Sequence, residues 1–406
     1  MSNEKKYYLR GVLEVVVTLF VSGGIIQTFF AEIGFSNQQI GSYTALTNLI
    51  QVVVMVLSIF LADTTRNVKG TMALLNLSTV VFCGVMLLPC LDPQMNADTI
   101  YWLVMALCTV RNLFAGFSGI LFFRMLYIVA DPEDFSRLES NNSILCGVFS
   151  IAVSGTVSLL SAWIDFRTIM TAGFFVSALF SIGVSLALNS LRPRSGFAPA
   201  QAKRFRPSIL LRRDFRFFYL PNFLRGLGNG LMGLMVVVCL KAVSSDTVVV
   251  SGLTAISSVA AVVGAWLFGA LRKKADTALL YAGCSLLMCL LLPLMVAGSS
   301  IPVFCSLYFI ISCAYYSNNI AGALYPTEYV PYEDIGAYTS VRLIVMTLGQ
   351  AVAGYIVPEL LEVLPAMLLL ALVGTAQLVS GLLFLCYDRR YVHSGSLFCI
   401  TDPQRN

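Results

Sequence analysis

The hydrophobic positions of this chain fall into about twelve blocks, each close to 20 residues long and separated by short polar or charged stretches. A helix needs about 20 apolar residues to cross the ~30 Å hydrocarbon core of a bilayer. A membrane β-barrel would instead show segments of about ten residues with alternating polarity, and the sequence has no such segments. The pattern therefore predicts an all-α, multi-pass membrane protein.

Breaks at charge, proline and glycine clusters divide the pattern into twelve predicted transmembrane helices. The first block has no A-x-A-like cleavage site and is followed by many similar blocks, so it is interpreted as a retained helix rather than a signal peptide. The predicted helices cover residues 12–35, 40–62, 70–91, 99–127, 141–164, 169–191, 217–243, 248–271, 277–298, 301–324, 335–357 and 365–387.

Composition agrees with this class and argues against an enzyme. Only 12% of the residues are charged, against roughly 25% in soluble domains. The eleven cysteines are scattered through apolar segments without metal-site spacing, and they are interpreted as small buried hydrophobes. The single histidine, His393, lies in the C-terminal tail. With no nucleophile–base arrangement and no cofactor motif, the sequence predicts a protein that is not an enzyme and has no cofactor or metal.

The basic residues predict the orientation. Nearly all of them fall on one side of the predicted helices, and only Arg167 and Lys241 fall on the other. The positive-inside rule then places both termini in the cytoplasm, in a cytoplasmic (inner) membrane. The basic segment 192–216 is interpreted as a linker that sets this topology, with binding of anionic lipid or nucleic acid as the alternative; no nucleic-acid partner is predicted.

The two halves of the chain resemble each other. "SYTALTN" at Ser42–Asn48 matches "SGLTAIS" at Ser251–Ser257, and "LYIVADPEDFSRLES" from Leu126 matches "LYPTEYVPYEDIGAYTS" from Leu324. Six helices, a basic loop and six further helices with weak internal similarity are typical of parallel-repeat transporters. The predicted domains are an N-terminal six-helix bundle at 1–191, a cytoplasmic linker at 192–216, and a C-terminal six-helix bundle with a short tail at 217–406.

One loop strengthens this interpretation. Residues 59–69, "IFLADTTRNVK", retain the Leu-Ala-Asp core and two downstream cations of the motif G-x-L-A-D-R-x-G-R-R, but lack its glycines and first arginine. With the repeat, the chain resembles the major facilitator superfamily over nearly its whole length. The resemblance implies a monomeric secondary transporter in which two pseudo-symmetric six-helix bundles rock around a midplane site. The R-x-x-x-G pattern of proton antiporters is only approximated, by Arg111 and Gly116.

Four charged side chains are interpreted as lying within the membrane: Glu14, Arg111, Arg225 and Arg342. An ionisable group at membrane depth costs at least a few kcal/mol, so it is a functional-site hypothesis by default. The four fall on the first, fourth, seventh and eleventh predicted helices. The resemblance implies that the third, sixth, ninth and twelfth predicted helices face lipid. None of the four charged side chains lies on these helices.

Arg111 and Arg225 are predicted to form a cationic clamp, one from each half. A guanidinium stays charged and offers a planar fork to a carboxylate or phosphate. The alternative is that each pairs with a carboxylate or with helix-end carbonyls. One acid against three arginines favours an anionic substrate. Glu14 either carries a coupled proton or forms a static ion pair.

Further polar and aromatic side chains complete the predicted site. They suit an organic solute with an apolar body, with hydrogen bonding between helices as the alternative. Arg342 is assigned to a cytoplasmic gate with Asp63 and Arg66, as the resemblance implies. The glycines of Gly228-x-Gly230-x-x-Gly233 match a dinucleotide fingerprint, but inside an apolar helix they predict close packing or bending. The other predicted substrate-binding residues are Gln27, Asn229, Tyr315, Tyr316, Asn318 and Asn319.

Taken together, the sequence predicts a secondary active transporter that moves a small organic anion across the cytoplasmic membrane by alternating access, with proton coupling left open. Its partners are the substrate, membrane lipid and a coupling ion if there is one. An exporter of amphipathic drugs with the same fold is one alternative. A non-transporting receptor or assembly factor is the second alternative. A large appended domain or a long tail would indicate such a protein, and the tails here are short.

Overall fold

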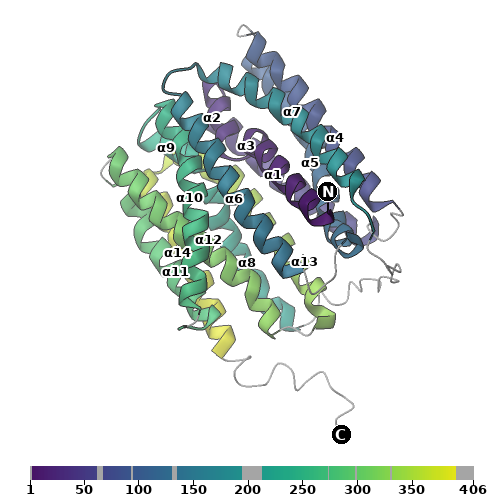
Figure 1. Ribbon diagram of the computed structural model, residues 1–406. Helices are drawn as coiled ribbons and strands as arrows, with labels where there is room; N and C mark the ends of the chain where they lie inside the picture. Colours follow the sequence, from purple (N-terminus) through teal and green to yellow (C-terminus); the bar gives the residue numbers. More distant parts are fainter. Residues whose placement is uncertain are drawn as a thin grey trace. The chain divides into compact units, whose positions relative to one another are not determined.

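The computed structural model describes residues 2–61, 67–92, 95–129, 135–193, 213–272, 274–297, 300–329 and 332–389 (Figure 1). These residues form fourteen α-helices and no strand. The helices are α1 (Asn3–Val21), α2 (Gly24–Glu32), α3 (Asn37–Leu61), α4 (Val68–Leu91), α5 (Ala97–Val129), α6 (Phe135–Leu160), α7 (Phe166–Ser190), α8 (Arg213–Met232), α9 (Met235–Ala242), α10 (Thr247–Leu271), α11 (Thr277–Met295), α12 (Ile301–Tyr329), α13 (Tyr332–Val363) and α14 (Ala366–Tyr387).

Each predicted transmembrane segment corresponds to one helix or to one broken pair. In the described part of the chain, ten helices are long and apolar enough to cross a membrane, or eleven when the bent pair α8 and α9 counts as one span. α6 falls short because only its stretch Ile144–Leu160 is apolar. The all-α membrane class is therefore confirmed.

The first and seventh predicted segments are each broken near their middle. The first breaks between α1 and α2, where Gly23 has a φ of 77°, a conformation that glycine adopts without steric cost. The seventh bends by 54° between α8 and α9. A break leaves backbone groups without helical partners, and in a membrane another group of the protein has to satisfy them. Here Gln27 Nε2 donates to the carbonyl oxygen of Gly233, 2.8 Å away.

Helix ends differ most from the prediction at the starts of α1 and α6 and at the end of α13. α6 begins at Phe135, whereas the prediction began it at residue 141. α1 begins at Asn3, capped by the side chain of Ser2, whereas the prediction began it at residue 12. The early start draws Arg10 into the helix, where it is 8% exposed. α13 continues through Pro358 to Val363, because neighbouring groups in a membrane protein can compensate for the lost backbone donor.

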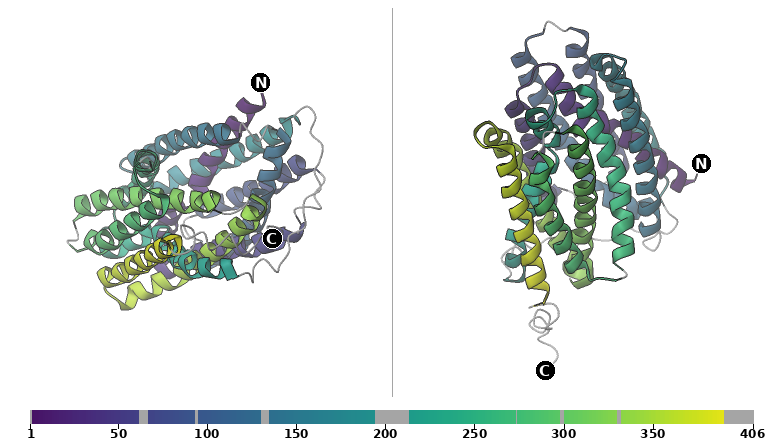
Figure 2. Two further views of the ribbon diagram at one scale, coloured as in Figure 1. Left: turned by 90° about the horizontal axis from the view of Figure 1, so that it is seen from below. Right: turned by 90° about the vertical axis from the view of Figure 1, so that its left-hand side faces the viewer.

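The described helices belong to two compact units. The first comprises residues 1–203 and 233–259, and thus holds α1 to α7, α9 and the first half of α10. The second comprises residues 204–232 and 260–406, with α8, the rest of α10 and α11 to α14. Figure 2 shows the helices from two further sides. The division into bundles at 1–191 and 217–406 stays a prediction.

Within each unit, corresponding helices pack together. In the first unit α4 lies along α7, and in the second α11 lies along α14 (Figure 1). These are the third and sixth predicted segments of each half. The first unit has a core around Tyr7, Met72 and Leu121, and the second has one around Tyr281 and Phe384. The shared pairing is what the internal repeat of the sequence predicts.

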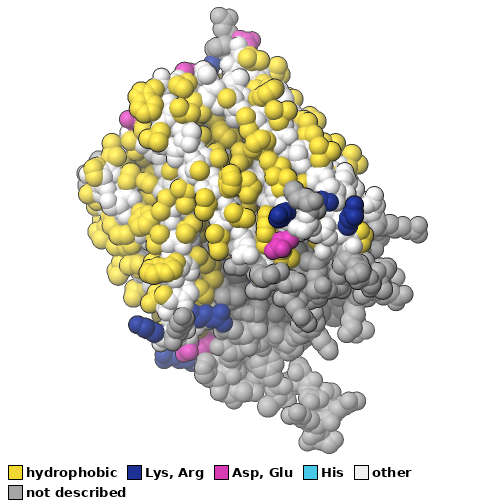
Figure 3. Space-filling model, viewed as in Figure 1, with side chains coloured by type: hydrophobic (Ala, Val, Ile, Leu, Met, Phe, Trp, Pro, Cys, Tyr) yellow, Lys and Arg dark blue, Asp and Glu magenta, His cyan; other side chains and the backbone are white. Residues whose placement is uncertain are grey.

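The surface of the described helices is largely hydrophobic. Figure 3 shows hydrophobic side chains spread over the visible face, with few charged ones among them. Leu74, Trp163 and Trp266 are 68%, 79% and 70% exposed. An apolar surface this extensive is unusual on a soluble monomer, and it fits contact with lipid.

Glycines let α8 and α13 approach closely. A Cβ added to Gly226 would overlap the carbonyl oxygen of Met346 and lie 2.9 Å from Gly349 Cα. One added to Gly230 would lie 2.6 Å from the Cβ of Ala353. Small residues at such contacts bring helix backbones together in membranes. The glycine motif of the seventh segment therefore packs helices, as predicted.

Gly226→Ala is expected to destabilise the protein, because α8 and α13 would have to move apart. Overpacking of this kind costs about 1–3 kcal/mol, and thermal unfolding in detergent would measure it as a lower midpoint. Gly283→Ala is the matched control, since nothing lies within 4 Å of a Cβ at that helical position. An equal midpoint for both variants would contradict the packing role.

Candidate functional site

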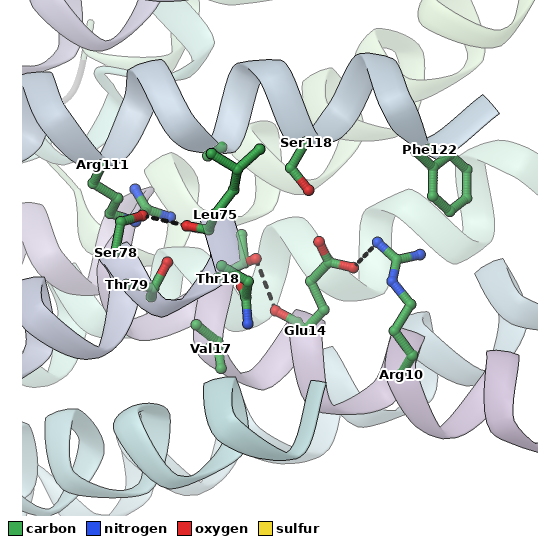
Figure 4. Close-up of a pocket in the computed structure, with 12 residues that line it drawn as sticks. Arg10, Glu14, Val17, Thr18, Leu75, Ser78, Thr79, Arg111, Ser118 and Phe122 are labelled. Atoms are coloured by element: carbon green, nitrogen blue, oxygen red, sulfur yellow. Dashed lines mark hydrogen bonds and ion pairs between the residues drawn. The ribbon is translucent and has the colours of Figure 1, made fainter. Parts of the chain in front are cut away.

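A pocket of about 210 Å³ lies in the first unit between α1, α4 and α5 (Figure 4). Three of its side chains are charged, five carry a hydroxyl or amide, and the rest are apolar. The lining residues are Arg10, Glu14, Val17, Thr18, Leu75, Asn76, Ser78, Thr79, Arg111, Ala115, Ser118 and Phe122. Two of the predicted site residues, Glu14 and Arg111, therefore share one pocket.

Glu14 forms an ion pair with Arg10, one helical turn before it. The spacing of four residues places both side chains on one face of α1. The Arg10 side chain is 10% exposed and that of Glu14 is 46% exposed. The Arg10 guanidinium also lies over the ring of Phe122, 4.6 Å from its centroid. The carboxylate thus has its counter-charge on its own helix.

Arg111 lies at the other end of the pocket (Figure 4). Its Nη1 donates to Asn112 Oδ1 at 3.4 Å, and its guanidinium lies 5.7 Å from the ring centroid of Phe82. Its Nε is buried without a hydrogen-bond partner. No ion pair joins Arg111 to an acidic side chain in the described parts of the chain.

Hydroxyl groups line the space between the two ends. Thr18 Oγ1 donates to the backbone oxygen of Glu14 at 2.8 Å, and Ser78 Oγ donates to that of Leu75 at 2.7 Å. Each oxygen keeps lone pairs that can accept a hydrogen bond. Thr79 and Ser118 also line the pocket.

Two amides on helices expected to face lipid, the half-buried Asn76 and the buried Gln377, point inward instead. Asn76 Nδ2 on α4 donates to the backbone oxygen of Ser181 at 2.7 Å and to Ser185 Oγ at 3.2 Å. Gln377 Nε2 on α14 donates to the backbone oxygen of Arg225 at 3.1 Å. Both amides join helices within one unit, where hydrogen bonds between membrane helices form.

In the second unit, Arg225 is almost fully enclosed, with 2% exposure. Its Nη2 donates to Asn319 Oδ1 at 2.8 Å and to the Asn319 backbone oxygen at 3.1 Å. The guanidinium lies 5.6 Å from the ring centroid of Tyr281. Nε and Nη1 are buried without a partner. The described neighbours of Arg225 thus offer neutral acceptors to Nη2, whereas Nε and Nη1 have no hydrogen-bond partner.

Gly322 lies beside this guanidinium. A Cβ at that position would overlap Arg225 Nη1, so glycine makes the space for the arginine. Arg342, 8% exposed, donates from Nη1 to the carbonyl oxygen of the same glycine. The predicted gate partners of Arg342, Asp63 and Arg66, lie outside the described residues.

The polar residues of α12 divide between two neighbours. Asn319 Oδ1 accepts from Arg225 and from Asn229 Nδ2, the latter at 3.1 Å. Asn318 Nδ2 instead donates to Ser285 Oγ at 3.0 Å and to the Tyr281 backbone oxygen at 3.2 Å. The structure therefore brings together Arg225, Asn229 and Asn319, and turns Asn318 toward α11.

The remaining predicted substrate-binding residues are Tyr315, Tyr316 and Gln27, and none of them lines the pocket of the first unit. Tyr315 and Tyr316 contact each other edge to face, with ring centroids 5.1 Å apart. Gln27, 2% exposed, is bonded to Thr44 Oγ1 at 3.2 Å and to Gly233 in the first unit. It does not line the pocket.

Sequence reasoning missed Arg10, Asn112 and Tyr281. Arg10 could have been found from its spacing, because it lies four residues before Glu14 and therefore on the same face of a helix. Asn112 is an amide beside a charged residue at membrane depth, which could have been recognised. Nothing in an apolar segment distinguishes Tyr281, and only the packing of α11 against α12 and α14 places it.

The two clusters have equivalent parts. Asn112 on α5 and Asn319 on α12 each present Oδ1 to an arginine, at 3.4 Å and 2.8 Å. Their separation of 207 residues falls between the offsets of the two sequence matches, 198 residues for Leu126 and Leu324 and 209 residues for Ser42 and Ser251. Each half therefore places an arginine against an asparagine of its fourth predicted helix.

The described residues contain no group of three His, Cys, Asp or Glu side chains that could hold a metal ion. The polar side chains described in both clusters are arginine, amide and hydroxyl groups, apart from the carboxylate of Glu14, which is paired with Arg10. Groups of this kind bind anions and hydrogen-bonding solutes better than hard cations.

No protein-family model and no curated protein matches the chain, but solved structures do. The D323A mutant of the nucleoside transporter NupG is 11% identical, with 95% of this chain and 99% of that chain covered and a TM-score of 0.72. A bacterial homologue of the iron transporter ferroportin, in an inward-facing state, is 12% identical, with coverage of 96% and 99% and a TM-score of 0.70. At such identities the likeness shows the fold alone, and this fold agrees with the all-α, multi-pass architecture that the sequence predicts.

Proposed function

We propose that the protein is a secondary active transporter that moves a small organic anion across the cytoplasmic membrane. The observation that carries this proposal is the pair of arginines, Arg111 and Arg225, that have unpaired guanidinium nitrogens and no acidic partner among the described side chains. A buried charge is costly unless it is paired. An anionic substrate would supply the missing charge.

The fold supports transport, since the similar structures are transporters by name. The shared fold does not mean that this chain transports the same substrates as those proteins. Uptake into liposomes containing the purified protein tests the proposal, with radiolabelled organic anions compared with organic cations of equal size. Uptake of cations alone would favour the drug exporter, and uptake of neither would favour the receptor or assembly factor.

Alternating access requires contacts that can open. In the first unit, Ser150 Oγ on α6 lies 2.9 Å from Ser258 Oγ on α10. Ser161 Oγ lies 3.2 Å from Ser251 Oγ. These contacts join segments that the sequence assigns to different bundles, and both are hydrogen bonds between serine hydroxyl groups. Such contacts are suited to breaking and reforming during transport.

A disulfide between cysteines at positions 150 and 258 is therefore expected to stop uptake, because α6 and α10 could no longer separate. The measurement is uptake before and after oxidation, and again after reduction, in a background without the eleven native cysteines. Cysteines at 73 and 185 are the control pair. Ser185 Oγ donates to the Ala73 backbone oxygen at 3.0 Å, and α4 and α7 belong to one predicted bundle.

Unchanged uptake in the oxidised 150/258 pair, with cross-linking verified by mass spectrometry, would show that this contact does not open during transport. Loss of uptake in the 73/185 pair alone would place the moving contact elsewhere.

The ion pair with Arg10 supports the static role of Glu14 over the proton-carrying role. The proposed arrangement has both termini in the cytoplasm and a monomer as the working unit, as the positive-inside bias and the resemblance imply.

A further inference from the structure

The pocket between α1, α4 and α5 has an incomplete charge balance. Its described lining includes two arginines, Arg10 and Arg111, and one acid, Glu14, which leaves a net charge of +1. In the low-dielectric interior of a membrane protein an unbalanced charge is costly. A ligand with one negative charge neutralises the pocket, whereas a ligand with two leaves it with a charge of −1.

The unbalanced charge is located at one end. Figure 4 shows the carboxylate of Glu14 directed at Arg10, and Arg111 at the opposite end of the pocket. Arg111 has only a long hydrogen bond, 3.4 Å, to Asn112. Its planar fork can receive a carboxylate with two parallel hydrogen bonds.

The middle of the pocket suits hydroxyl groups on the ligand. The hydroxyl protons of Thr18 and Ser78 are engaged by backbone oxygens, so these two oxygens face the pocket as acceptors. Ligand hydroxyls can donate to them. A carboxylic acid with hydroxyls on its neighbouring carbons therefore fits better than a simple fatty acid.

The size of the pocket limits the ligand. A volume of about 210 Å³ corresponds to about seven water molecules at ~30 Å³ each. Pockets for drug-sized ligands are roughly 300–1,000 Å³. The pocket therefore admits a molecule of a few carbons, or the acidic end of a longer one.

We propose that this pocket binds a small hydroxylated monocarboxylate, with its carboxylate on Arg111 and its hydroxyls toward Thr18 and Ser78. Glu14, held by Arg10, sets the preference for a single negative charge. Arg10 is thus a positioning residue. This inference rests on the proposed function, because it names the class of anion that is transported.

Two probes of nearly equal size test the charge preference. Glycerate has one carboxylate, and tartronate has a second carboxylate in place of the hydroxymethyl group. Calorimetric titration of the purified protein is expected to show glycerate binding at least ~10-fold more tightly than tartronate, the equivalent of about one unfavourable charge contact. In Glu14→Gln the described lining has a net charge of +2, and the preference is expected to fall by at least ~10-fold or to reverse.

Glu32→Gln is the matched control, since Glu32 ends α2 and does not line the pocket. It is expected to keep the wild-type preference. If Glu14→Gln does not fold, Arg111→Gln provides the second measurement. It is expected to weaken glycerate binding at least ~10-fold, whereas Arg167→Gln, outside the pocket, leaves it unchanged.

The inference is overturned if the wild type prefers tartronate, if Glu14→Gln keeps the wild-type preference, or if glycerate does not bind at millimolar concentration. Binding in detergent does not depend on transport. Glycerate that binds but is not taken up into liposomes would therefore overturn the proposed function alone. Uptake of another anion by a protein that does not bind glycerate would overturn this inference alone.

Discussion

Uptake of the transported anion is expected to fall at least ~10-fold in Arg111→Lys, although the charge is retained. Both described contacts of the Arg111 side chain are made by its guanidinium: Nη1 donates to Asn112 Oδ1, and the planar group lies near the ring of Phe82. Lysine is a point charge that cannot form two parallel hydrogen bonds to a carboxylate. Its strongly hydrated ammonium would also be poorly placed beside an aromatic ring.

The measurement is initial uptake in liposomes at matched protein content, with Arg167→Lys as the control. Arg167 lies in the first turn of α7 and does not line the pocket, so its replacement is expected to leave uptake unchanged. Thermal unfolding of both variants distinguishes lost function from lost stability. Wild-type uptake by Arg111→Lys would remove this residue from the predicted clamp.

Asn319→Asp is expected to raise stability and to abolish anion uptake. Asn319 Oδ1 already accepts hydrogen bonds from Arg225 and Asn229 at 2.8 Å and 3.1 Å. A carboxylate of the same shape would keep both contacts and supply Arg225 with a counter-charge. Since leaving a buried charge without its partner costs about 3–5 kcal/mol, the net gain after desolvation is expected to be about 2 kcal/mol.

The same substitution removes the charge that the substrate is proposed to need. If Arg225 binds the anion, uptake is expected to fall by at least ~10-fold while the unfolding midpoint rises. If Arg225 is only structural, the midpoint rises and uptake is unchanged. The two measurements together therefore distinguish the clamp from its alternative, a static arginine satisfied by helix carbonyls and amides.

Asn318→Asp is the control, because this substitution is expected to lower the stability of the protein rather than raise it. Asn318 Nδ2 donates to the Tyr281 backbone oxygen and to Ser285 Oγ. In Asn318→Asp an acceptor would face the Tyr281 carbonyl oxygen, and the buried group left unsatisfied is expected to cost about 1–3 kcal/mol. A rise in stability in both variants would mean that the effect does not come from pairing with Arg225.

The sequence alone was enough to predict the class, the helices and the repeat. Blocks of about 20 apolar residues have few alternatives in a bilayer, because every backbone group must be satisfied within its own helix. Even the glycines of the seventh segment were predicted correctly as packing residues, since small residues in a membrane helix have few other uses. Arg111 and Glu14 were recognised for the same reason, as charges that are costly at membrane depth.

Tertiary structure alone decided which polar groups of different helices meet, whereas the pair of Arg10 and Glu14 lies within one helix. The ion pair of Glu14 with Arg10 depends on where α1 begins, a boundary that local pattern locates poorly. The contacts of Arg225 with Asn319, and of Asn318 with α11, depend on the rotation of α12, which adjacent residues of one sequence do not reveal. Asn76 and Gln377 point inward because an acceptor on a neighbouring helix receives a hydrogen bond from each amide nitrogen. Hydropathy determines how many helices cross the membrane, whereas packing between helices determines which face of each one receives a polar group.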